Sequence, residues 1–86
     1  MPKKHLGTIT ILVEDRQMHS VDVQRILTEN GHLIMARLGV NVQRMCVEHC
    51  TGFIVVAVEG SSAEISALTK KLDKLYGVVA KATVVK

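Results

Sequence analysis

The most reactive side chains of the sequence lie in one short segment, CVEHC at positions 46–50. It contains both cysteines of the chain, Cys46 and Cys50, with Glu48 and His49 between them. Thiolate, imidazole and carboxylate groups are the ligands that proteins use for zinc, nickel or iron. The segment is therefore a candidate transition-metal site.

The spacing within this segment limits what it can do alone. In an extended strand the two cysteines and Glu48 point to one side, while His49 points to the other. One extended segment therefore cannot close a tetrahedral site with all four groups. A loop conformation is required, or a donor from another strand or subunit, such as His32 or His19. The C-x₃-C spacing also differs from the C-x₂-C spacing of common zinc sites.

Three interpretations of the two cysteines stay open. In the first, they are ordinary hairpin residues, with Cys46 exposed and Cys50 packed as a small hydrophobic side chain. In the second, they bind a transition metal. In the third, they form a redox-switched disulfide. Cysteine use in an apparently cytosolic chain argues against a structural disulfide.

Other polar residues favour structural roles. His19 lies on the inward stripe of an expected helix, near its start, where the helix dipole disfavours an imidazolium ion. We therefore expect a half-buried neutral histidine there, and an exposed one at His32.

The sequence has no Ser-His-Asp order, pair of catalytic carboxylates or glycine-rich phosphate loop. We expect no catalytic residues and no enzymatic activity.

Alternating and helical patterns predict the elements that position these side chains. Asp15 is expected to cap the first helix, and Ser61 with Glu64 has the spacing of a capping box for the second. Gly31 is expected to end the first helix in a left-handed conformation, and Gly77 to end the second. The expected strands are residues 6–13, 32–39, 52–60 and 78–85, and the expected helices are residues 16–30 and 61–75.

This order of elements predicts one α+β domain over residues 1–86. Two right-handed crossovers build a ferredoxin-like βαββαβ sandwich, a four-stranded antiparallel sheet with both helices on one face. The strand over 52–60 is apolar on both faces, so we expect it to be central and covered on both sides. The face without helices carries Leu12 and Val79 beside several threonines. We expect a partner subunit there or along a sheet edge.

Composition narrows the functional classes. The 86 residues are 48% hydrophobic and 2% aromatic, so the core must be aliphatic. The net charge of +3 is dispersed and has no interleaved aromatic side chains, so direct nucleic-acid binding is not expected. No apolar run approaches the roughly 20 residues of a membrane span, and the opening residues suit a strand better than a secretion signal. We expect a cytoplasmic homo-oligomer, a dimer or tetramer.

Several stretches of the sequence carry a family resemblance. They are TITILVEDR at 8–16, MARLGV at 35–40 and the C-terminal half from FIVVAVEG onward. Within that half, ISALTKKL at 65–72 and GV-x-x-K-A at 77–82 are the most specific parts. From about residue 6 to the C-terminus, the chain resembles the small ACT-like proteins described as iron-only hydrogenase system regulators.

This resemblance implies an ACT-like fold, akin to the C-terminal domain of nickel-responsive repressors, and a non-catalytic role linked to a hydrogenase system. Amino-acid-binding ACT domains have a glycine in the turn after the first strand, where this chain has EDRQMHS. The resemblance therefore does not extend to their amino-acid site. Our leading hypothesis is a regulatory module that oligomerises and binds a small effector at the interface. The alternatives are a metal-binding sensor or carrier using CVEHC and a structural adaptor.

Overall fold

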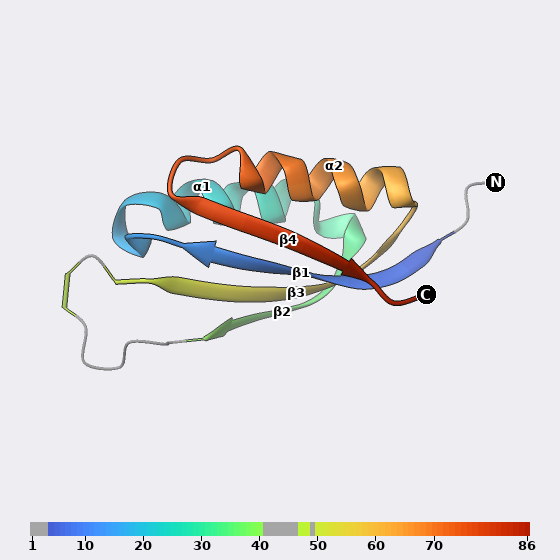
Figure 1. The fold of residues 1–86 in the computed structure, drawn as a ribbon, viewed down its shortest axis with the longest axis horizontal. Helices are drawn as coiled ribbons and strands as arrows, with labels where there is room; N and C mark the ends of the chain where they lie inside the picture. Colours follow the sequence, from blue (N-terminus) through green and yellow to red (C-terminus); the bar gives the residue numbers. More distant parts are fainter. Residues whose placement is uncertain (1–3, 41–46, 49) are drawn as a thin grey trace.

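Strands and helices alternate along the chain in the expected βαββαβ order. The structure, a computed structural model, describes residues 4–40, 47–48 and 50–86. In chain order the elements are β1 (His5–Val13), α1 (Arg16–Glu29), a 3₁₀ turn (Gly31–Leu33), β2 (Ile34–Val40), β3 (Gly52–Gly60), α2 (Ser62–Asp73) and β4 (Val78–Val84). The sheet has the order β2-β3-β1-β4, every neighbouring pair is antiparallel, and both helices cover one face (Figure 1). The ferredoxin-like prediction is confirmed.

The alternation of residues in β1 places the core on the helix side of the sheet. Ile9, Ile11 and Val13 are fully buried there, while the intervening Thr8 and Thr10 lie on the other face. The antiparallel register continues the buried layer into β3, and both helices press apolar stripes onto it. The residues that β3 and the helices add to this core are Ile54, Val56, Val58, Val23, Ile26, Leu27, Ile65, Leu68 and Leu72.

The second helix begins and ends as its sequence predicts. The Glu64 backbone N–H donates to the Ser61 hydroxyl over 3.1 Å, and the Ser61 backbone N–H donates to the Glu64 carboxylate over 2.9 Å. These two bonds complete the expected capping box. After the helix, Gly77 has a φ of 73°, the left-handed conformation that glycine adopts without steric cost.

Both ends of the first helix differ from expectation. Asp15 occupies the N-cap position, but with a φ of 49° and no capping bond from its side chain. Its backbone carbonyl instead accepts from the N–H groups of Met18 and His19. At the other end Gly31 is not left-handed, because Asn30 ends the helix. The Asn30 side-chain amide donates to the Ile26 carbonyl over 2.8 Å, and the chain turns directly into the 3₁₀ segment.

The strand β3 is central, as expected, but this chain covers it on one face. Phe53, Val55 and Ala57 point to the face without helices and are half-buried. In the register Phe53 lies beside Leu12 on one side and Val40 on the other. The described residues of one copy of the chain therefore do not cover β3 on both faces.

Candidate functional site

The first turn of α1 holds the end of the segment that the sequence singles out. The Arg16 backbone N–H donates to the Cys50 carbonyl over 2.7 Å. The Gln17 side chain accepts from the Cys50 backbone N–H over 3.1 Å and donates to the Cys50 sulfur over 3.4 Å. It also donates to the Val47 carbonyl over 3.5 Å. The start of α1 therefore fixes both the backbone and the sulfur of Cys50.

Cys50 is 1% exposed, in agreement with the packed position that the first interpretation gives it. It is also disulfide-bonded, and no described cysteine is free. This state departs from the first interpretation, in which both cysteines are ordinary unbonded residues, and from the argument against a structural disulfide. Glu48 lies on the surface. Cys46 and His49 lie outside the described residues.

His32, considered as an additional metal ligand, lies far from this segment. His32 is exposed in the 3₁₀ turn before β2, whereas Cys50 precedes β3, at the opposite end of the sheet. The seven residues of β2 alone span roughly 20 Å. Within one chain, His32 is therefore too far from Cys50 to share an ion with it.

His19 is half-buried, as expected, and its ring packs edge-on against Tyr76 with the ring centroids 5.6 Å apart. Across residues 4–40, 47–48 and 50–86, no three metal-binding side chains form a group that could hold an ion. The proposed set of Cys46, Glu48, His49, Cys50 and His32 stays a prediction, because two of its members are not described.

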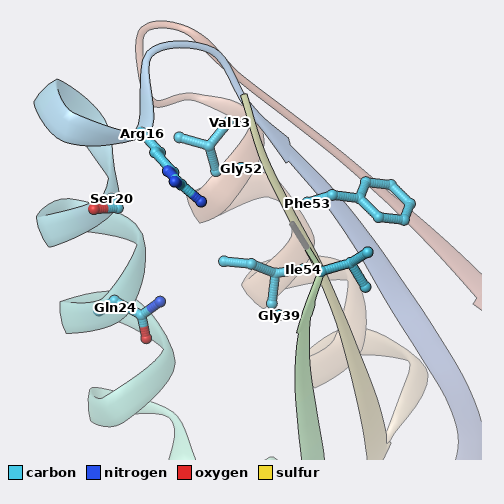
Figure 2. A pocket seen from close by; sticks show the side chains of 9 residues that line it. Val13, Arg16, Ser20, Gln24, Gly39, Gly52, Phe53 and Ile54 are labelled. Atoms are coloured by element: carbon cyan, nitrogen blue, oxygen red, sulfur yellow. The ribbon is translucent and has the colours of Figure 1, made fainter. Parts of the chain in front are cut away.

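The helix side of the sheet also contains a groove that sequence reasoning missed. It lies between α1 and the adjoining ends of β2 and β3 and has a volume of about 260 Å³ (Figure 2). Arg16, Ser20 and Gln24 line its helix wall. On the strand side it is lined by Val13, Gly39, Val40, Gly52, Phe53 and Ile54.

The helix wall of this groove is polar because three side chains recur at four-residue spacing on one face of α1. Figure 2 shows Arg16 and Gln24 extending from the helix toward the gap in front of β3. The only signal in the sequence was this i, i+4, i+8 series beside the apolar stripe of the same helix. This series indicates a binding site only when the structure shows that Gly39 and Gly52 lie opposite it on the strands.

Comparisons with known proteins agree with the observed fold. A family model described as "TM1266-like: Iron-only hydrogenase system regulator, putative" matches residues 5–82. The structure of the uncharacterized protein TM1266 from Thermotoga maritima matches with a TM-score of 0.85 and 27% identity, over 98% of this chain and 100% of that one. No curated protein matches.

A more distant match is CPII, a nitrogen regulatory PII-like protein from Thiomonas intermedia K12, whose structure holds ADP, AMP and bicarbonate. Its TM-score is 0.54 at 15% identity, over 98% of this chain and 99% of that one, so the likeness concerns the fold. In the described part of this chain, no helix is both long enough and apolar enough to cross a bilayer.

Proposed function

Because the chain belongs to the TM1266-like family of iron-only hydrogenase system regulators, we propose that it is a regulatory module and not an enzyme. We propose that it works by self-association and by binding a small effector. The family description supports the regulatory role. The observation that carries self-association is the uncovered face of the sheet.

An apolar row crosses that face from edge to edge. Val40 pairs with Phe53, Phe53 with Leu12, and Leu12 with Val79, so these four side chains follow one another across all four strands. Leu12, Val40 and Val79 are between 38% and 44% exposed, and Leu38 beside them is 62% exposed. A continuous apolar row of this kind is a common basis for a protein–protein contact.

A second copy of this chain is the partner that suits the row. The same face also carries Glu59 and Lys81, which point outward beside Leu6 and Thr10. A copy that docks face to face therefore brings both signs of charge together with its own apolar row. Small domains bury a limited share of their surface alone, so this contact also adds stability.

Size-exclusion chromatography with light scattering tests the self-association. We expect an oligomer at micromolar concentration and a shift to the monomer in Leu12→Lys, because the new ammonium group would be desolvated in the interface. Val21→Lys is the matched control, since Val21 is 72% exposed on α1, away from the sheet. A monomeric wild-type protein, or a Leu12→Lys variant with unchanged mass, would contradict this part of the proposal.

One observation favours a second function, the binding of a transition metal by CVEHC. The first turn of α1 fixes the Cys50 backbone and donates a hydrogen bond to its sulfur. A ligand sulfur held in one orientation costs less entropy to engage, and hydrogen bonds to a thiolate stabilise it. The proposed donors are Cys46, Glu48, His49 and Cys50, with His32 as a donor from another subunit. Such a site requires reduced cysteines.

A further inference from the structure

The groove between α1 and the strands exists because two positions opposite the helix are glycines. Gly39 pairs with the buried Ile54, so both face the helix side of the sheet. A Cβ atom at Gly39 would meet nothing within 4 Å. The open space above Gly39 is therefore a gap in the helix–sheet packing that a larger side chain would fill.

The second glycine determines where Arg16 lies. A Cβ atom built on Gly52 would come within 3.2 Å of the Arg16 Cβ and 3.9 Å of its Cδ. The aliphatic stem of Arg16 thus passes directly over Gly52, which directs the guanidinium into the groove (Figure 2). Gln24 also extends toward the groove, and Ser20 lies between the two on the same side of α1.

Within residues 4–40, 47–48 and 50–86, no carboxylate forms an ion pair with Arg16. On the solvent side of α1, by contrast, Arg25 forms ion pairs with Asp22 and Glu29. The residues that line the groove include one cation and no carboxylate. A half-buried guanidinium beside apolar side chains, with no ion pair to the described residues, is suited to bind an anion.

The backbone of α1 narrows the choice of anion. Three N–H groups of its first turn already donate within the protein, from Arg16 to Cys50 and from Met18 and His19 to Asp15. They are not available to hold a phosphate in the manner of a helix N-terminus. Recognition therefore relies on side chains, and one planar guanidinium fork can hold a carboxylate or a phosphate through two parallel hydrogen bonds. One cation balances the charge of a monocarboxylate, whereas a phosphate dianion would keep an unbalanced charge beside the apolar lining.

The rest of the groove is apolar. Val13 is 1% exposed and Ile54 is 8% exposed, and both lie on the helix side of the sheet. The volume of about 260 Å³ lies just below the range typical of sites for drug-sized molecules. We propose that the groove binds a small aliphatic monocarboxylate, with its carboxylate on Arg16 and its hydrocarbon part on Val13 and Ile54. This inference rests on the proposed effector-binding role and assigns the effector a site within one chain.

Titration of isotope-labelled protein followed by NMR tests the site. The probes are acetate, butanoate, 3-methylbutanoate and hexanoate, with 3-methylbutanamide as a neutral analogue and inorganic phosphate as a second anion. An acid of about seven non-hydrogen atoms should bind with a Kd on the order of 1 mM. We expect 3-methylbutanoate to shift the amide signals of Ile54 and Gln24, and the amide and phosphate to bind at least about tenfold more weakly.

Two variants and one control decide whether the groove is responsible. Arg16→Met keeps the aliphatic stem and removes the charge, so binding should weaken about ten- to hundredfold. Gly39→Leu should abolish binding by filling the space above Gly39. Arg25→Met removes a cation from the solvent side of the same helix, so it should bind like the wild type. Unchanged denaturation midpoints would verify that the variants are folded.

The possible failures are distinguishable. If the wild type binds a carboxylate and both groove variants bind it equally well, the groove assignment is overturned and effector binding stands. Equal affinity for the amide and the acid would also overturn it. If no carboxylate binds while the protein still oligomerises, the groove inference is overturned and the self-association half of the proposed function survives.

Discussion

At the scale of single residues, Gly77 has a conformation that its neighbours enforce. Its φ of 73° lies where a side chain is strained, and an added Cβ would come within 3.0 Å of the His19 ring. That ring is in turn held by Tyr76. The glycine therefore serves the close packing of the α2–β4 turn against the start of α1.

Replacement of this glycine should be costly. We expect Gly77→Ala to lower the free energy of unfolding by about 1–3 kcal/mol through backbone strain and displacement of His19. Gly31→Ala is the control, because Gly31 is not left-handed and its Cβ would meet nothing within 4 Å. Urea denaturation should show a lower midpoint for Gly77→Ala and an equal or higher one for Gly31→Ala. Equal midpoints for the two variants would contradict the argument.

These two glycines also show what residue type alone predicts. Both follow a helix pattern in the sequence, so both were expected as helix stops, yet only Gly77 is left-handed. The difference comes from Asn30, whose side chain bonds back to Ile26 and ends the helix one residue earlier. Asp15 was similarly expected to cap α1 with its side chain, but its backbone carbonyl takes the first-turn N–H groups.

At the scale of elements, α2 begins with an arrangement that its sequence specified completely. The Ser61 hydrogen bonds lower the pKa of Glu64 from its ordinary value of 4.5, and the positive charges of His32 and Lys4 act in the same direction. Because the folded pKa is lowered, ionised Glu64 stabilises the protein above its ordinary pKa. That stabilisation is lost as the pH falls through the lowered value.

Two measurements on α2 check this capping box. Ser61→Ala should cost about 1 kcal/mol of stability, whereas Ser62→Ala, one residue into the helix, should be close to neutral.

Glu64→Gln should be less stable than the wild type at neutral pH, and the difference should shrink as the solution is acidified below pH 4.5. Thermal unfolding of both proteins over a pH series measures it. A difference that grows on acidification would contradict the assigned direction.

At the scale of the whole molecule, sequence reasoning predicted the fold well and the groove not at all. The alternation in β1 and the apolar stripes of α1 and α2 each indicate which side of that element is buried. The order of the six elements then leaves few ways in which they can pack together. The groove depends on what faces Arg16 across the helix–sheet interface. Gly39 and Gly52 come from separate strands, and no local pattern of the chain connects them to α1.

The metal proposal is also a statement about the whole molecule, because an ion bound to the folded state alone stabilises all of it. At an ion concentration of about 100 times its Kd, the free energy of unfolding should rise by about 2.7 kcal/mol. We expect this rise when zinc or nickel is added to reduced protein under anaerobic conditions. The oxidised protein, in which Cys50 is disulfide-bonded, should not respond.

Two variants locate the ion if such a rise is observed. Cys50→Ser should lose the stabilisation, because the sulfur that Gln17 contacts would be absent. His32→Gln should keep it if the site lies within one chain, since His32 is at the far end of β2. If His32→Gln instead loses the stabilisation by metal, His32 must reach the ion from a second subunit. The monomeric Leu12→Lys variant should then lose the stabilisation by metal as well. Reduced wild-type protein that neither retains metal nor gains stability would end the metal proposal.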